Sequence, residues 1–323
     1  MNFQTRLASA RCSVGCVAFL LFALGLSPAR AVRAEDPFRR ENLVAWCIVP
    51  FDSHKRTPAE RAEMLDRLGI HRLAYDYRAE HIPTFDDELD ELAKHKIELT
   101  AWWFPAVLND EARLILRVLE RHGVKTQLWV TGGGKPTTSS EEQRQRVQAE
   151  ADRIRPIAQA AAKQGCTVAL YNHGGWFGEP ENQLAVIDQL KMANVGIVYN
   201  LHHGHAHVAR FTQLLDRMKP HLMAINLNGM VPDGEAQGQK IVPLGAGSLD
   251  VELLKTIRDS GFPGPIGILN HTDHDAEARL RDNLEGLEWL LPQLDGQPAA
   301  AAPQYRTWPD APKPPAPKPT AKP

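Results

Sequence analysis

Short apolar runs alternate with longer amphipathic stretches along the chain from Asn42 onward. Each run is long enough for one strand and too short for a buried helix. Apolar runs between amphipathic helices are typical of a parallel sheet that is buried on both faces. The eight runs are "NLVAWCIV" (42–49), "HRLAYDY" (71–77), "IELTAWWF" (97–104), "KTQLWVT" (125–131), "TVALYN" (167–172), "VGIVYN" (195–200), "LMAINLN" (222–228) and "PIGILN" (265–270).

The stretches between the runs carry helix signals at both ends. "TPAERAEMLDRLG" begins at Thr57 and "SLDVELLKTIRDSG" begins at Ser248, and both residues are good N-caps. The two stretches end at Gly69 and Gly261, where a helix commonly stops. Strand and helix therefore repeat as βα units.

Eight βα units over about 250 residues predict a single (β/α)₈ TIM barrel. The barrel is expected to cover residues 40–295. The alternative is an open doubly wound sheet, but no glycine-rich dinucleotide-binding fingerprint follows the first run.

Both ends of the chain differ in composition from the barrel. Arg6 and Arg11 precede the apolar run "CVAFLLFALGL", and small residues follow in "SPARAVRAE". This order predicts a signal peptide over residues 1–34, with cleavage after Ala31 or Ala34, and hence a periplasmic or secreted protein. The run is short for a membrane anchor, which is the other interpretation, so no stable membrane insertion is expected after cleavage. At the other end, residues 299–323 are rich in Pro, Ala and Lys and are expected to form a disordered tail.

Charge and cysteine content narrow the function classes. The chain has 323 residues and a formal net charge of -2, so nothing favours nucleic acid as a partner. Cys47 and Cys166 lie in apolar runs without a CxxC spacing. They are expected to be small core residues rather than zinc ligands or redox groups.

Polar and aromatic residues gather where the predicted strands end, which is where the active site of a (β/α)₈ barrel lies. The second to fourth runs bring Asp76, Arg78, Trp103 and Trp129 to this end. The last four runs bring Tyr171, Asn172, His173, Asn200, His203, His205, Asn226, Asn228, Asn270 and His271.

Asparagines take matching positions in the last four runs. Asn172, Asn200, Asn226 and Asn270 each follow an apolar residue two positions earlier, and Asn228 continues the alternation after Asn226. Side chains two apart point to the same face of a strand. If that face is the barrel interior, we expect a ring of amides above the core.

Four histidines fall within the stretch "YNLHHGHAH" (199–207). Its place after the sixth strand predicts an active-site loop. The local sequence alone leaves a metal site, a catalytic base, a sugar pocket and a polar loop all open.

The chain resembles the xylose isomerase-like TIM-barrel superfamily, which includes sugar isomerases and epimerases. The resemblance covers nearly all of residues 42–295, and its most specific parts are "YNHGG" (171–175), "VGIVYNLHHGHA" (195–206) and "IVPLGAGSLD" (241–250). It implies a divalent metal held by Glu, Asp, His and Glu at strand ends, and isomerisation or epimerisation of keto sugars through an enediolate.

The match at the metal ligands is uneven. His203 falls on the sixth-strand histidine of the family, but Asn200 stands where its Asp is expected. Tyr171, Asn226 and Asn270 stand at the fifth-strand Glu, seventh-strand His and last-strand Glu positions. Mg²⁺ and Mn²⁺ prefer anionic oxygens, so this set should hold them poorly. The family's glutamate base is missing as well.

Three interpretations of this polar end follow. His173, His203, His205 and His271 could hold a divalent metal, with Zn²⁺ favoured over Mg²⁺ or Mn²⁺. Alternatively, His54, His173, His203 and His205 could work without metal beside Asp52 or Asp76. In the third interpretation the barrel binds a carbohydrate without changing it, since amides and imidazoles pair well with hydroxyls.

The sequence favours an exported sugar isomerase/epimerase-like barrel that acts on a small carbohydrate. The alternative is a carbohydrate-binding pseudoenzyme of the same fold. The predicted catalytic residues are His203, His173, His205 and Asp76. The predicted substrate-binding residues are Arg78, Trp103, Trp129, Tyr171, Asn172, Asn200, Asn226, Asn228, Asn270 and His271.

Overall fold

The computed structural model describes Met1 and residues 36–308. The predicted signal peptide, apart from Met1, and the tail residues 309–323 lie outside these described residues. Among the residues described, no helix has the length and apolar character needed to cross a membrane.

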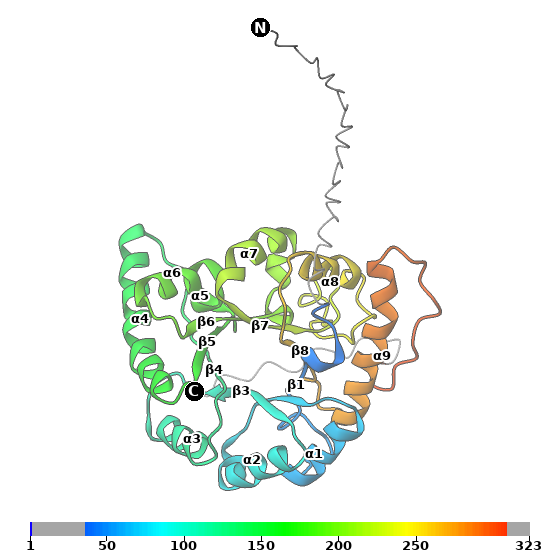
Figure 1. The fold of residues 1–323 in the computed structure, drawn as a ribbon, viewed down its shortest axis with the longest axis horizontal. Coiled ribbons are helices and arrows are strands. Elements are labelled where there is room, and N and C mark those ends of the chain that lie inside the picture. The colour runs from blue at the N-terminus through cyan, green and yellow to red at the C-terminus, as the bar shows by residue number, and fades with distance from the viewer. Residues whose placement is uncertain (2–35, 309–323) are drawn as a thin grey trace, which may run out of the picture. The chain divides into compact units, whose positions relative to one another are not determined.

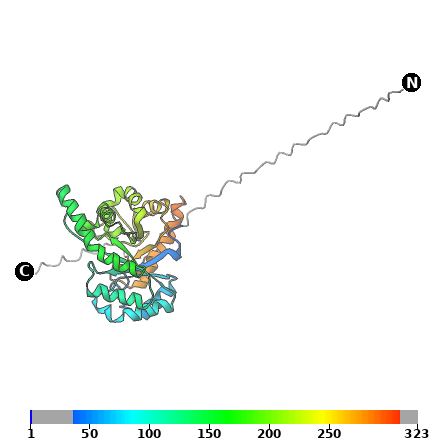
Figure 2. The same ribbon diagram turned by 60° about the vertical axis from the view of Figure 1, so that its left-hand side comes forward.

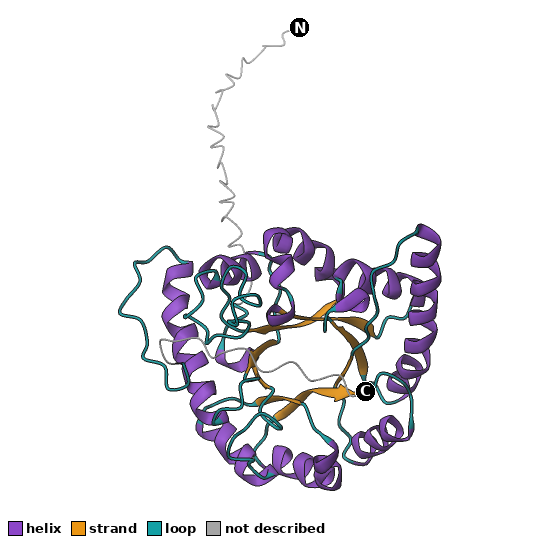
Figure 3. Ribbon diagram, turned by 180° about the vertical axis from the view of Figure 1, so that it is seen from behind, coloured by secondary structure: helices purple, strands orange, loops and turns teal. Residues whose placement is uncertain are grey.

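Eight parallel strands close into one barrel, and each strand pairs with its neighbours in chain order. Figures 1 and 3 show the strands as a central ring with helices around it. The predicted single (β/α)₈ TIM barrel is thus confirmed. The strands are β1 (Leu43–Trp46), β2 (Arg72–Tyr75), β3 (Glu98–Phe104), β4 (Gln127–Val130), β5 (Thr167–Tyr171), β6 (Val195–Asn200), β7 (Leu222–Leu227) and β8 (Ile266–Leu269).

Helices connect the strands and form the outer layer, and α4 projects beyond its neighbours in Figure 2. They are α1 (Pro58–Arg67), α2 (Phe85–Lys94), α3 (Asp110–Arg121), α4 (Ser140–Lys163), α5 (Gly175–Gly178), α6 (Pro180–Leu190), α7 (Phe211–Met218), α8 (Asp250–Asp259) and α9 (Ala276–Leu294). Short 3₁₀ helices are η1 (Arg40–Asn42), η2 (Ala79–Thr84), η3 (Leu201–His203), η4 (His205–Arg210) and η5 (Lys219–His221).

One of the two predicted helix starts is confirmed. Thr57 caps α1 in a full capping box with Glu60. Ser248 does not cap α8, because the helix begins two residues later and its N-cap is Leu249. The buried Asp250 carboxylate instead accepts N–H bonds from the preceding loop, at Met230, Gly245 and Gly247. Both predicted ends are confirmed, since Gly69 and Gly261 adopt positive φ.

The apolar side chains form two layers. The inner cluster fills the barrel and includes Val44, Trp46, Ala101, Trp129 and Val198. The outer cluster lies between the strands and the helices and is much larger. Alternate residues of each strand belong to alternate layers, as a parallel sheet covered on both faces requires.

The chain after α9 returns to the barrel. The buried Asp282 of α9 accepts hydrogen bonds from the backbone N–H groups of Arg306 and Thr307 and from the Thr307 hydroxyl. The Tyr305 hydroxyl donates to the carbonyl of Leu244 at 2.9 Å. The predicted disordered tail was to begin at residue 299. Its described part is instead held against the barrel at 305–307, which we call the C-terminal clasp.

Removal of the clasp should destabilise the fold. A chain ending at Pro303 loses every bond to Asp282 from residues 306 and 307. Hydrogen bonds to a charged group contribute about 1.5–3 kcal/mol each, and water replaces part of this. We expect the free energy of unfolding to fall by about 2 kcal/mol in urea denaturation. A chain ending at Trp308 keeps the clasp and is the control; an equal loss in both truncations would contradict the assignment.

Candidate active site

A small cavity lies where the strands end, inside the rim of the barrel. Its volume is about 70 Å³. Predicted site residues that line it are Asp76, Arg78, Trp103, Tyr171, His173, His203 and His271. Four further residues complete the wall and were not predicted as site residues: Trp46, Cys47, Phe51 and His202.

Only a weak signal in the sequence pointed to the four lining residues that were not predicted. Trp46 ends β1 and belongs to the inner layer, so strand alternation could have identified it. Cys47 follows it with a φ of 57°, which breaks the alternation. His202 adjoins the predicted His203, but both lie in the 3₁₀ turn η3, where strand periodicity no longer applies. The ring of Phe51 packs on His271 with centroids 3.8 Å apart.

Four imidazoles come together in the cavity. The ring centroids of His202 and His203 are 3.7 Å apart, and those of His173 and His203 are 4.5 Å apart. His202 and His271 are 6.2 Å apart. Burial and the neighbouring imidazoles lower the pKa of His203 to about 3. These rings are therefore neutral at pH 7, and each can donate and accept one hydrogen bond.

The pKa values of the other three rings are shifted in the same direction, although His173 and His271 are exposed to solvent on one side and are only partly desolvated. Burial lowers the pKa of His271 to about 4, and Arg78 lowers it further against the effect of Asp273. Burial also lowers the pKa of His173, and it lowers that of His202 well below the usual range.

Asp76 provides a carboxyl group to the same cavity. Its side chain is buried, and one oxygen accepts a 3.3 Å bond from the backbone N–H of Val49. The other oxygen, Oδ2, is buried without an N–H or O–H partner among the described residues. Burial raises the pKa of Asp76 to about 7, although nearby Arg78 opposes this shift. Burial and Asp76 in turn raise the pKa of the Cys47 thiol. Asp76 is thus poised to take up or release a proton near neutral pH.

The raised pKa of Asp76 has a consequence for stability. In the unfolded chain this group titrates near its ordinary value of 3.8. Between about pH 4 and 7 the folded protein holds a proton that the unfolded chain releases, so the contribution of Asp76 to stability falls as pH rises through this window.

The variant Asp76→Asn lacks this pH-dependent contribution, because its amide does not titrate. Relative to wild type, the variant should gain on the order of 1 kcal/mol per pH unit from pH 4 to 7. Urea denaturation across this range tests the prediction, and a constant difference would contradict it. Asp250 is another buried carboxyl whose pKa is raised to about 7. Because wild type and variant both contain it, its contribution to the pH dependence cancels in the difference between them.

Three of the predicted asparagines bond to one another. Asn172 Oδ1 accepts from the backbone N–H and the amide of Asn200, at 2.8 and 2.9 Å. Asn226 donates to Asn200 Oδ1 at 2.6 Å. The expectation that these amides all share one face of the sheet is wrong. Asn172 and Asn270 lie on the same strand face as Leu170 and Ile268, which belong to the outer cluster. Asn200 and Asn226 lie on the face of the inner cluster. The amides form a buried ladder across the strands rather than a ring inside the barrel.

The remaining predicted amides are also occupied within the fold. Asn270 donates to the carbonyl of Ala276, and Asn228 donates to the carbonyls of Gly229 and Lys240. None of the five asparagines lines the cavity, and each is at most 1% exposed. Trp129 is likewise fully buried in the inner layer. Their contact with a substrate remains a prediction, since the structure buries them outside the lining of the cavity.

The four-histidine stretch divides into two pairs. His202 and His203 line the cavity, whereas His205 and His207 turn away in η4. His205 Nε2 lies 2.9 Å from the carbonyl oxygen of Lys240. His207 bridges the Tyr199 hydroxyl and Glu179. His205 is therefore apart from the cavity, and its predicted catalytic role has no contact there to support it.

The family's divalent metal does not fit these residues. At the family's ligand positions, the oxygens of Asn200 and Asn270 already face amide donors at 2.6 and 3.5 Å. Tyr171 is buried among aromatic rings, and burial raises the pKa of its hydroxyl well above the usual range. Nowhere in Met1 and residues 36–308 do three or more His, Cys, Asp or Glu side chains gather in a way that could hold a metal ion.

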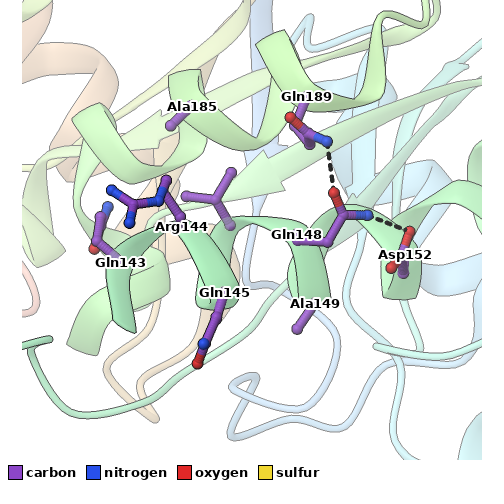
Figure 4. A pocket seen from close by; sticks show the side chains of 9 residues that line it. Gln143, Arg144, Gln145, Gln148, Ala149, Asp152, Ala185 and Gln189 are labelled. Atoms are coloured by element: carbon purple, nitrogen blue, oxygen red, sulfur yellow. Dashed lines mark hydrogen bonds between the residues drawn. The ribbon is translucent and has the colours of Figure 1, made fainter. Parts of the chain in front are cut away.

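A larger groove lies on the outer wall of the barrel. Its volume is about 800 Å³, and it runs between α4 and α6 (Figure 4). Gln189 donates to Gln148, which donates to Asp152. The groove has no histidine or cysteine in its lining, so the cavity at the strand ends is the better candidate site.

Solved structures of the same fold share little sequence with this chain. A 3-keto-D-glucoside 4-epimerase from E. coli is 15% identical, covers 77% of this chain and 98% of its own, and has a TM-score of 0.59. An IOLI protein with a bound zinc atom is 14% identical; the match covers 78% of this chain and 98% of that protein, with a TM-score of 0.61. A probable 3-DHS dehydratase from Bacillus anthracis is 16% identical; the match covers 76% of this chain and 98% of that protein, with a TM-score of 0.59.

No curated protein sequence matches the chain. A family model described as the xylose isomerase-like TIM barrel matches residues 104–293, which is more than half of the chain. The match spans β4 to β8 and therefore includes His173, His203 and His271 of the cavity. The chain belongs to the xylose isomerase-like TIM barrel family.

Proposed function

We propose that the protein is an exported sugar isomerase or epimerase that acts on a keto sugar by acid–base chemistry. The observation that carries this proposal is the buried Asp76 carboxyl, which shares one cavity with four neutral imidazoles. A buried carboxyl with a pKa near 7 is suited to accept a proton from carbon. The solved epimerase of the same fold acts on a keto sugar and supports this choice of substrate.

The proposed step moves one proton and shifts two electron pairs. The Asp76 carboxylate takes a proton from the carbon beside the substrate carbonyl. The electron pair of that C–H bond forms the carbon–carbon double bond of an enolate, and the π pair of the carbonyl moves onto its oxygen. A neutral imidazole of the cavity, from His173, His202 or His203, donates a hydrogen bond to this oxygen. Return of a proton to carbon then completes the exchange.

Solvent deuterium exchange tests this proposal and does not require that the product sugar be identified. The purified protein is mixed in D₂O with a panel of keto sugars, including a 3-keto-glucoside, D-fructose and D-xylulose. NMR should show loss of the proton beside the carbonyl. The rate should fall as pH drops below about 7, where Asp76 is protonated, while the imidazoles of His203 and His271 remain neutral to about pH 4. No exchange with any sugar of the panel would contradict a catalytic role.

One observation favours a second candidate function, the binding of a carbohydrate without turnover. The cavity of about 70 Å³ is small beside common ligand pockets of roughly 300–1,000 Å³. A barrel that only held the edge of a sugar ring would need no more room. Sugar binding in calorimetry together with absence of deuterium exchange would favour this function.

Export is supported by the sequence pattern at the N-terminus. We expect mass spectrometry of the protein recovered from its native cells to find a mature N-terminus at Val32 or Glu35. A chain that retains residues 1–31 would contradict export with cleavage.

A further inference from the structure

A second recess lies at the same end of the barrel, one loop away from the cavity. Its volume is about 320 Å³. It is formed by the loop after β4, the start of α4, and the segment from α5 into α6. Its lining residues are Pro136, Thr137, Gln143, Gly175, Trp176, Glu179 and Asn182. The proposed chemistry uses none of them.

Two glycines join the recess to the cavity. His173 lines the cavity and Gly175 lines the recess, so two peptide units, at most about 7 Å, separate them. Gly174 and Gly175 both have positive φ, and no atom lies within 4 Å of where a Cβ of Gly174 would stand. A Cβ on Gly175 would lie 2.8 Å from the carbonyl oxygen of Gly134. The short segment that links the two spaces therefore carries no side chain of its own at these two positions, and at Gly175 it packs against the backbone of Gly134.

The amide groups of the recess are fixed before any ligand binds. Gln143 Oε1 accepts from the Thr137 hydroxyl and from the indole N–H of Trp176, both at 2.7 Å. Gln143 donates to Asn182 Oδ1 at 2.8 Å, and Asn182 donates to the carbonyl of Trp176 at 2.7 Å. Each of the two amides still has a hydrogen that these bonds do not use. A ligand with hydroxyl groups would meet donors whose positions are already set.

Glu179 is the carboxylate of the recess and is held from behind. His207, which is buried, approaches it at 3.3 Å, and Arg210 donates to Oε2 at 2.8 Å. The side chain of Glu179 nevertheless stays 45% exposed. A fixed carboxylate accepts hydrogen bonds from neighbouring hydroxyls. Glu179 is the one ionisable side chain in this lining, and Arg210 offsets its charge, so the lining offers hydrogen-bond partners to the hydroxyls of a neutral group and no unpaired charge for a phosphate or a uronate.

We propose that this recess is a second subsite, which binds a neutral glycosyl unit attached to the sugar ring held in the cavity. The inference rests on the proposed function, and it specifies the substrate as a glycoside of at least two units. It also gives a reason for the small size of the cavity, since much of the ligand would lie in the recess.

Isothermal titration calorimetry tests this subsite with named probes. The purified protein is titrated with D-glucose, D-galactose and D-mannose, and with the disaccharides cellobiose, maltose, lactose and trehalose. We expect at least one disaccharide to bind tenfold or more tighter than its component monosaccharides. Glu179→Gln should weaken that disaccharide roughly tenfold, because charge-assisted hydrogen bonds are lost. Its monosaccharide affinity should stay the same.

Glu181→Gln is the matched control. Glu181 also pairs with Arg210 but does not line the recess, so this variant should bind like wild type. Glu179→Ala is a second variant, and circular dichroism checks that both fold. Equal affinity for mono- and disaccharides, or equal losses in the Glu179 and Glu181 variants, would overturn the subsite and leave the proposed function standing. Absence of binding by every probe to wild type would also overturn the subsite, whereas the proposed function falls only if the keto-sugar panel shows no deuterium exchange.

Discussion

Replacement of Asp76 by Asn is expected to lower the rate of deuterium exchange into a keto sugar by about 10²–10⁴-fold. The amide keeps the shape of the carboxyl and cannot accept the proton. Since Asp76 is the carboxyl in the lining of the cavity, no other carboxylate there can take over. The exchange rate at saturating sugar, followed by NMR at pH 7.5, measures the effect. Sugar affinity should change much less than the rate, because the imidazoles stay in place.

Asp273→Asn is the control for this experiment. Asp273 is exposed beside His271 and does not line the cavity. Its φ is 54°, a conformation that Asn tolerates as well as Asp. The control makes the same chemical change at the same rim and should keep the wild-type rate. Equal rates for wild type and Asp76→Asn would remove Asp76 from the proposed chemistry.

Replacement of Glu88 by Gln should destabilise the fold by about 3–5 kcal/mol. Arg61 of α1 and Glu88 of α2 form a bidentate ion pair at 3.0 and 2.9 Å. Their side chains are only 2% and 1% exposed. Burial lowers the pKa of Arg61, but the attraction to Glu88 outweighs it, and the pKa is raised overall. Loss of the carboxylate leaves a buried charge without its partner. Urea denaturation at pH 7 measures the loss.

An exposed ion pair of α2 provides the matched comparison. Asp86 pairs with Arg121, and both side chains are about half exposed. Asp86→Asn should therefore cost less than about 1 kcal/mol. The double variant Arg61→Met with Glu88→Leu should recover most of the stability, since it removes both buried charges. A loss at Glu88 no larger than that at Asp86 would show that water reaches Arg61.

Regular periodicity made the barrel and part of the site predictable. The apolar runs identified the strands, and the rule that active sites lie at strand ends led to Asp76, Trp103, Tyr171 and His173. The same rule overextended at Trp129 and Asn200, which are fully buried and do not line the cavity. Strand alternation gives the face on which a side chain lies but not its depth along the barrel.

Other features had no local signal. The positive φ of Cys47 and the 3₁₀ turn that carries His202 break the strand period. The pairing of the asparagine amides depends on the register between strands, which no single strand's sequence determines. The C-terminal clasp lies in a segment with the composition of a disordered tail, and its partner Asp282 is more than twenty residues earlier.

The proposed chemistry transfers a proton on a keto sugar without the family's metal, and this is the central claim to test. Deuterium exchange by protein dialysed against EDTA, with metal content checked by ICP-MS, tests it most directly. We predict exchange at the full rate in metal-free protein, and no gain when Zn²⁺, Mn²⁺ or Mg²⁺ is added. Exchange that is lost on dialysis and restored by one of these metals would contradict it.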